Sequence, residues 1–211
     1  MNSLLVISLL LSLATDKTSE YVTQGMNLFR DGRVRESLTQ FDRAIEISHQ
    51  VEPYLWQRGI SQYCLGDYAA GRRQFELHQD VNPNDVENAA WHYFCVAKRE
   101  GKEAAQKALL PINTEHDQRV PMKQIYQYLA GEATQEVVLR AATQENTPLA
   151  RMYAHLYLGL CSEIQGDGPQ ALRHLQIASS QKLKGSYMQD VAKVMLDQTL
   201  RSGNESDTDK H

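Results

Sequence analysis

The signatures of several protein classes are missing from this chain of 211 residues. Runs of β-branched residues are few, and the Asn-Gly dipeptide typical of tight hairpins does not occur, which disfavours a β-sheet protein. The phosphate-loop, G-x-G-x-x-G, H-E-x-x-H and G-x-S-x-G motifs are all absent. The sequence therefore predicts an all-α protein, and we expect it to be no enzyme and to bind no cofactor.

Cysteine and clustered charge are scarce too. The three cysteines, Cys64, Cys95 and Cys161, lack C-x-x-C spacing, so we expect neither a disulfide framework nor a zinc site and interpret them as buried structural thiols. None of the seven histidines lies four residues from another, which leaves no helical metal-binding pair. The formal net charge is −4 and the Lys and Arg residues are scattered, so nucleic-acid binding is not expected either.

No hydrophobic run is long enough to span a membrane. The apolar run Leu4–Leu13 covers ten residues, whereas a transmembrane helix needs about 20. Its length and the Ser12-Leu13-Ala14 sequence predict a signal peptide over residues 1–14, although no Lys or Arg precedes the run. An amphipathic first helix and a start codon chosen too late are the alternatives. Export predicts a periplasmic or secreted protein, and a retained segment predicts a cytoplasmic one.

A 34-residue pattern is present twice. The matching positions are Gly25 and Gly59, Gly32 and Gly66, and Phe41 and Phe75. In the second copy a small residue at Gly59 allows two helices to approach closely, Phe75 fills the space between them, and Pro83 ends the second helix. This pattern resembles the tetratricopeptide repeat (TPR), a helix–turn–helix unit that stacks into a solenoid. The resemblance implies a right-handed solenoid of helical hairpins.

The remaining segments continue the helical pattern less regularly, and Gly159 and Leu175 keep the repeat spacing near the end of the chain. The densest polar cluster, Glu115-His116-Asp117, falls in a segment that we interpret as a solvated loop. A half-polar last helix is suited to cover the exposed end of a solenoid. The predicted segments are TPR 1 over 18–51, TPR 2 over 52–85, a degenerate pair over 86–111, an irregular pair over 121–146, a TPR-like pair over 147–183, a capping helix over 186–202 and a disordered tail over 203–211.

The TPR resemblance also implies a binding surface, because the first helices of the repeats line a concave groove. Carried over by repeat position, the predicted partner-binding residues are Val22, Met26, Phe29, Arg30, Trp56, Ile60, Tyr63, Phe94 and Lys98. Trp, Tyr and Arg are the residue types that dominate protein-interface energies. The alternative is that the aromatic members belong to the core between repeats. Val22 and Met26 replace the Lys and Asn of the carboxylate clamp of chaperone-binding TPR domains, so that subclass is excluded.

The order of the segments is similar to that of the bacterial envelope TPR lipoproteins of the new-lipoprotein-I type. Besides the repeat residues, the resemblance over 19–200 is carried by Asp85, Trp91, Tyr93, Tyr128-Leu129 and the helix that starts at Thr147. It implies a dimeric, non-catalytic adaptor that brings envelope proteases and peptidoglycan hydrolases together. The chain departs from that family because no lipid-accepting cysteine follows the apolar run. The alternative is a TPR scaffold or pilot subunit of another assembly, in secretion, in a pilus or in a cytosolic complex.

Overall fold

The computed structural model describes the backbone of residues 2–208 and the side chains of residues 16–201. Throughout the described backbone the regular secondary structure is helical, which confirms the all-α prediction. Two compact units divide the chain, Met1–Val81 and Asn82–His211. No described helix is both long enough and apolar enough to cross a membrane.

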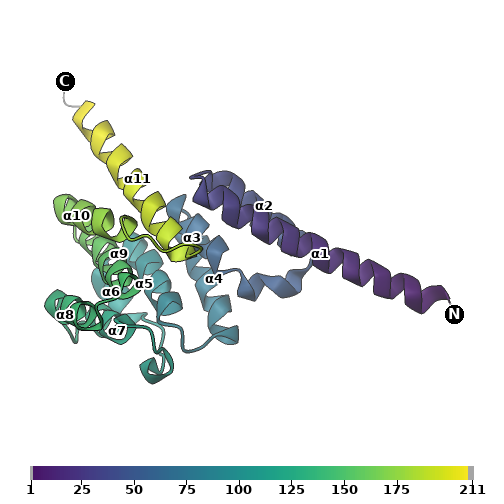
Figure 1. The fold of residues 1–211 in the computed structure, drawn as a ribbon, viewed down its shortest axis with the longest axis horizontal. Coiled ribbons are helices and arrows are strands. Elements are labelled where there is room, and N and C mark those ends of the chain that lie inside the picture. Colours follow the sequence, from purple (N-terminus) through teal and green to yellow (C-terminus); the bar gives the residue numbers. More distant parts are fainter. Residues whose placement is uncertain (1, 209–211) are drawn as a thin grey trace. The chain divides into compact units, whose positions relative to one another are not determined.

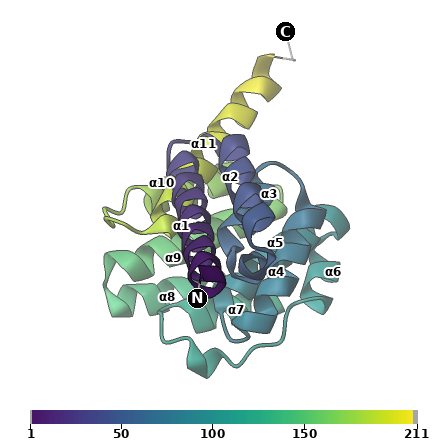
Figure 2. The same ribbon diagram turned by 90° about the vertical axis from the view of Figure 1, so that its right-hand side faces the viewer.

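The first unit consists of two helix pairs. α1 (Asn2–Arg30) packs along α2 (Val34–Ile47), and the 3-10 segment η1 (His49–Tyr54) leads into the pair α3 (Trp56–Cys64) and α4 (Tyr68–Val81) (Figures 1 and 2). α1 begins at Asn2, well before the first repeat predicted from residue 18. The side chains of the predicted signal peptide lie outside the described residues.

The predicted close approach within each pair of the first unit is confirmed. A Cβ atom added to Gly25 would lie 2.7 Å from Cε1 of Phe41, and one added to Gly59 would lie 2.7 Å from Cζ of Phe75. Both distances are shorter than van der Waals contact, so a larger residue would push the aromatic ring away in a closely packed interior. The spacing of glycine and phenylalanine therefore sets how closely the paired helices pack.

The second predicted repeat starts differently from a regular helix hairpin. Pro53 lies inside η1, and α3 begins only at Trp56. Proline lacks a backbone N–H and its ring clashes with the preceding turn, so a proline here is compatible with a 3-10 turn and not with an α-helix interior. Polar contacts also join the helices of this unit, where Arg58 Nε donates to Asp42 (2.7 Å) and Arg58 Nη1 donates to Gln74 (3.0 Å).

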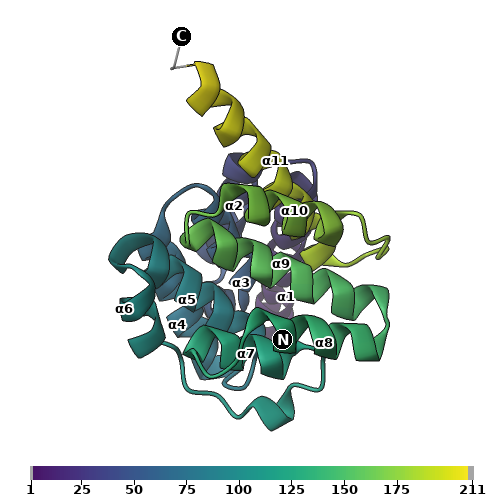
Figure 3. The ribbon, with the colours of Figure 1, turned by 90° about the vertical axis from the view of Figure 1, so that its left-hand side faces the viewer.

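The second unit surrounds a long central helix. Figure 3 shows α9 with α8 and α10 beside it, and α9 also packs against α5, α7 and α11. The helices of this unit are α5 (Val86–Glu100), α6 (Lys102–Lys107), η2 (Thr114–His116), α7 (Met122–Ala130), α8 (Gln135–Glu145), α9 (Pro148–Ile164), α10 (Gly168–Ser179) and α11 (Tyr187–Thr208).

Aromatic side chains of α5 and α9 form the centre of this unit. Trp91, Phe94 and Tyr157 are buried, and the rings of Phe94 and Tyr157 stack with centroids 6.2 Å apart. The third glycine contact occurs between α9 and α10, where a Cβ atom on Gly159 would lie 3.0 Å from Cγ of Leu175. α9 is therefore fixed on one side by aromatic packing and on another by a close helix–helix contact.

The capping residues and helix boundaries predicted from the sequence are found only in part. Thr147 caps α9 as predicted, since its hydroxyl accepts from the Ala150 N–H (3.2 Å), with proline next to it at the first helical position. Ser186 accepts from the Gln189 N–H (3.3 Å), but the Gln189 amide bonds Ala178 and Ser179 carbonyls instead of completing a capping box. α11 ends at Thr208, beyond the predicted boundary at 202, and the last residues of the predicted tail, 209–211, lie outside the described residues.

Candidate functional site

Four of the nine predicted groove residues are buried. Phe29, Ile60 and Phe94 are fully buried, and Tyr63 is 3% exposed. Their expected role as an open apolar surface is therefore wrong, and the alternative that the aromatic members belong to the core applies. The TPR resemblance placed them on a concave surface by their repeat positions, and in the folded chain these side chains are covered.

The other predicted groove residues differ in exposure. Val22 and Met26 are half-buried and pack against a cluster of Phe41, Ala44 and Leu55, while Trp56 is half-buried and Arg30 is exposed. Lys98 donates to Glu163 on α9 (2.5 Å). Seven of the nine predicted residues lie in the first unit, and Phe94 and Lys98 lie in the second.

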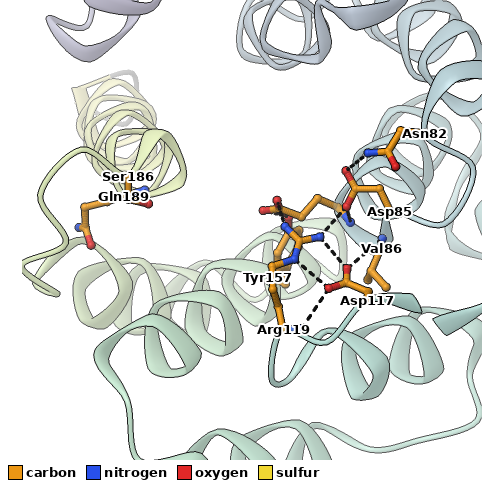
Figure 4. A network of polar contacts seen from close by, with 9 residues as sticks. Asn82, Asp85, Val86, Asp117, Arg119, Tyr157, Ser186 and Gln189 are labelled. Atoms are coloured by element: carbon orange, nitrogen blue, oxygen red, sulfur yellow. Dashed lines mark hydrogen bonds and ion pairs between the residues drawn. The ribbon is translucent and has the colours of Figure 1, made fainter. Parts of the chain in front are cut away.

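A cluster that sequence reasoning did not single out surrounds Arg119 in the second unit. Figure 4 shows the Arg119 guanidinium between Asp85 and Asp117. Arg119 Nη2 lies 2.6 Å from Asp85 and 2.6 Å from Asp117, and Nη1 pairs with Glu87. We call Asp85, Glu87, Asp117, Arg119 and Tyr157 the Arg119 cluster.

Each carboxylate of the Arg119 cluster also bonds the backbone or a neighbouring side chain. Asp85 caps α5 by accepting from the Glu87 N–H (3.1 Å). Asp117 accepts from the N–H groups of Val86 (3.4 Å) and Arg119 (3.1 Å). Glu87 accepts from the Tyr157 hydroxyl on α9 (3.2 Å). The cluster thus ties the loop between α6 and α7 to the start of α5 and to α9.

Burial corrects the interpretation of this loop as a solvated segment. The Asp117 side chain is only 3% exposed, and that of Arg119 is 35% exposed. The Arg119 guanidinium lies over the ring of Tyr153 on α9, 5.7 Å from its centroid, a cation–π arrangement. Glu115 and His116 are exposed as expected. The residues from Asp117 to Arg119 therefore fix the loop to the rest of the unit, while Glu115 and His116 face solvent.

Burial dominates the electrostatics of Glu87. Burial raises the pKa of the Glu87 carboxyl to about 7, although the neighbouring Arg119 guanidinium opposes this change and the Asp85 carboxylate adds to it. Arg119 is surrounded by three carboxylates, and the pKa of its guanidinium is raised by the hydrogen bond to Asp117 and by those charges, against the effect of burial. One cation therefore faces three carboxyl groups, and burial favours the neutral form of Glu87.

The geometry of the Arg119 cluster fits a structural role better than a catalytic one. Its guanidinium already occupies the space between the carboxylates, and no nucleophile faces it among the described contacts. An open hollow of about 390 Å³ next to it is lined by Asn84, His116 and Gln118 together with cluster residues. Across the described side chains, no group of three or more His, Cys, Asp or Glu residues is arranged to hold a metal ion.

The pKa of Glu87 leads to a test by pH. A carboxyl whose pKa is raised on folding stabilises the fold below about pH 4.5, and this contribution is lost as the pH rises through about 7. Glu87→Gln removes the buried charge, while its amide oxygen still accepts from Tyr157 and two carboxylates remain for Arg119. We therefore expect the variant to gain stability relative to the parent at pH 8 and to lose this advantage at pH 5, measured as urea midpoints.

Glu115→Gln is the matched control for this test. Glu115 is exposed and pairs with Lys123, whose hydrogen bond lowers the Glu115 pKa. This carboxylate should therefore favour folding at neutral pH, and its replacement should bring no gain at pH 8. An equal response of both variants, or a loss of stability for Glu87→Gln at pH 8, would contradict the assignment.

The cysteines are placed much as predicted. Cys95 and Cys161 are buried and Cys64 is half-buried. Burial raises the pKa of the Cys161 thiol to about 12, which suppresses the reactive thiolate at neutral pH. The Lys102 charge opposes this shift only in part, so the Cys161 thiol is not activated as a nucleophile.

Comparison with known proteins does not assign the chain to a family. No protein-family model matches the chain, and no curated protein matches it. The function must therefore be inferred from the residues and their arrangement.

Proposed function

We propose that the chain is a non-catalytic protein–protein interaction adaptor or scaffold of the TPR type. The observation that supports this most directly is a recurring contact between paired helices. A glycine on the first helix faces a large residue sixteen positions later in three pairs, at Gly25 and Phe41, Gly59 and Phe75, and Gly159 and Leu175. Such a regular helix hairpin is a framework for binding and supplies no catalytic group of its own.

The resemblance to the new-lipoprotein-I type extends this proposal. On that basis we place the protein in the bacterial envelope as an exported homodimer that brings proteases or peptidoglycan hydrolases together. A scaffold or pilot subunit of another assembly is the second candidate.

Because four of the predicted groove residues are buried, we restrict the proposed partner contact to residues that are at least partly exposed. In the first unit the half-buried Trp56 follows Tyr54, whose side chain is 61% exposed at the end of η1. Aromatic side chains with an exposed face are typical anchors at protein interfaces. We therefore propose that Tyr54 and Trp56 contact the partner, while the buried Phe29, Ile60 and Tyr63 belong to the core.

Partner binding tests the proposal. A partner should first be captured with the tagged protein from cell-envelope and cytosolic fractions, and its affinity then measured by calorimetry. Trp56→Ala should weaken binding by about 2 kcal/mol or more, roughly 30-fold in Kd, because a large aromatic contact is lost.

Leu149→Ala is a suitable control, since Leu149 is an exposed apolar residue on α9 in the other unit. It should leave the affinity unchanged. Equal losses for both variants would reject Trp56 as an anchor. Hydrolase or protease activity of the purified chain would reject the non-catalytic adaptor itself.

A further inference from the structure

A polar hollow of about 440 Å³ lies in the second unit, lined by α8, α9 and the segment after α10. Its polar lining residues include Asn146, Thr147, Arg151, His155 and Gln181, and none of its lining residues is Asp or Glu. The absence of carboxylates is notable in a chain with 26 acidic and 22 basic residues. Arg151 therefore supplies the charge among the lining residues, and it is positive.

Three of the lining residues share one face of α9. Thr147, Arg151 and His155 follow one another at intervals of four residues, which places their side chains in a row along the helix. Thr147 caps the N-terminus of this 17-residue helix, the end at which the helix dipole favours negative charge. The Arg151 guanidinium is exposed and has no hydrogen-bond or ion-pair partner among the residues with described side chains.

The orientation of His155 follows from a chain of hydrogen bonds. The Gln170 amide oxygen accepts from Arg173 Nη2 (2.5 Å) and Nε (3.2 Å), so its amide nitrogen faces His174 Nε2 (3.1 Å). An amide nitrogen only donates, and His174 Nε2 must therefore be an acceptor with the ring proton on Nδ1. His174 Nδ1 then donates to His155 Nδ1, 2.8 Å away.

This chain leaves the proton of His155 on Nε2. Both imidazoles favour the neutral form, since burial lowers the pKa of His155 to about 4 and lowers that of His174 as well. The Nε2–H of His155 has no acceptor within the described part of the chain. A fixed N–H donor is thus available on the residue that lines the hollow beside Arg151.

We propose that this hollow binds an oxyanion, the carboxylate or phosphate group of a ligand, with Arg151 supplying the charge and His155 Nε2–H a directed hydrogen bond. A guanidinium is the side chain best suited to planar or tetrahedral oxyanions, since it presents several N–H donors on one plane. The lack of lining carboxylates removes the repulsion that would otherwise oppose an anion. The site shares no residue with the proposed aromatic contact surface of the adaptor.

NMR of the histidine rings in the full-length protein tests this proposal. Inorganic phosphate and acetate should be titrated separately at constant ionic strength, with His155 assigned through a His155→Gln variant. In the free protein the ring ¹⁵N shifts should show the proton of His155 on Nε2 and that of His174 on Nδ1. A saturable change of the His155 shifts with either anion is expected, and the anion that binds more tightly identifies phosphate or carboxylate chemistry.

Arg151→Gln should weaken this binding by at least about tenfold, the loss typical of one charged hydrogen bond. Arg140→Gln is the matched control, because Arg140 is an exposed arginine on α8 that does not line the hollow. It removes the same charge and should change the affinity less than twofold. The proposal is overturned if neither anion gives a saturable change, if both variants respond equally, or if His155 carries its proton on Nδ1.

Discussion

Phe75→Ala is expected to lower the free energy of unfolding of the first unit by about 3–5 kcal/mol. The Phe75 side chain is 1% exposed and fills the contact with Gly59, where a Cβ atom would lie only 2.7 Å from the ring. Alanine leaves a cavity that the neighbouring helix can close only in part, because glycine offers no side chain to fill it. The loss therefore combines the lost burial of the ring with the cost of the cavity.

The two tryptophans allow each unit to be monitored separately. Trp56 lies in the first unit and Trp91 in the second, and the chain contains no other tryptophan. In a Trp91→Phe background, the fluorescence of Trp56 should report the urea unfolding of the first unit. Leu77→Ala on the same helix is the control, since Leu77 is exposed and should cost less than about 1 kcal/mol. Similar losses for both variants would contradict the packing described for Phe75.

Arg119→Met is expected to destabilise the second unit by about 2–3 kcal/mol. Methionine retains the length of the side chain but leaves Asp85, Glu87 and Asp117 without their common cation. Removing one partner of a fully buried ion pair costs about 3–5 kcal/mol. The Arg119 side chain is 35% exposed, so solvent screens part of the effect and the smaller value applies.

A double variant separates lost charge pairing from lost packing. Adding Glu87→Gln to Arg119→Met removes the cost of burying or protonating this carboxyl at pH 8 and should recover part of the stability. Arg140→Met is the control for removal of an exposed arginine, expected within about 0.5 kcal/mol of the parent. A double variant no more stable than Arg119→Met alone would show that the cluster acts through packing and not through charge.

Sequence periodicity predicted the helices well where the signals are local. The spacing of Gly59 and Phe75 predicted their contact, since a glycine on one helix and a large residue on its partner are needed for close packing. Thr147 followed by proline predicted the start of α9, because the capping interaction is made within a single turn. The first helix was less well predicted, because nothing in the sequence at residues 15–18 interrupts α1.

The groove and the Arg119 cluster could not be predicted in the same way. The repeat positions carried over from the TPR resemblance assigned Phe29, Ile60 and Tyr63 to the groove, but apolar residues at these positions are compatible with a buried core or an open groove. From the local sequence, Asp85 and Glu87 are ordinary residues at the start of a helix, and Asp117 and Arg119 are ordinary loop residues. Their meeting depends on contacts between residues about thirty positions apart, for which no local signal exists.

The sequence by itself determined the all-helical class, the paired helices and the glycine contacts between them. These depend on the helical period, on capping and on the size of single residues, which act over one helix or one turn. Only the tertiary structure decided which apolar faces are covered, which carboxylates share Arg119 and that the rings of His155 and His174 meet. Burial and charge pairing of this kind depend on how distant segments pack, and that packing is set by the whole unit together.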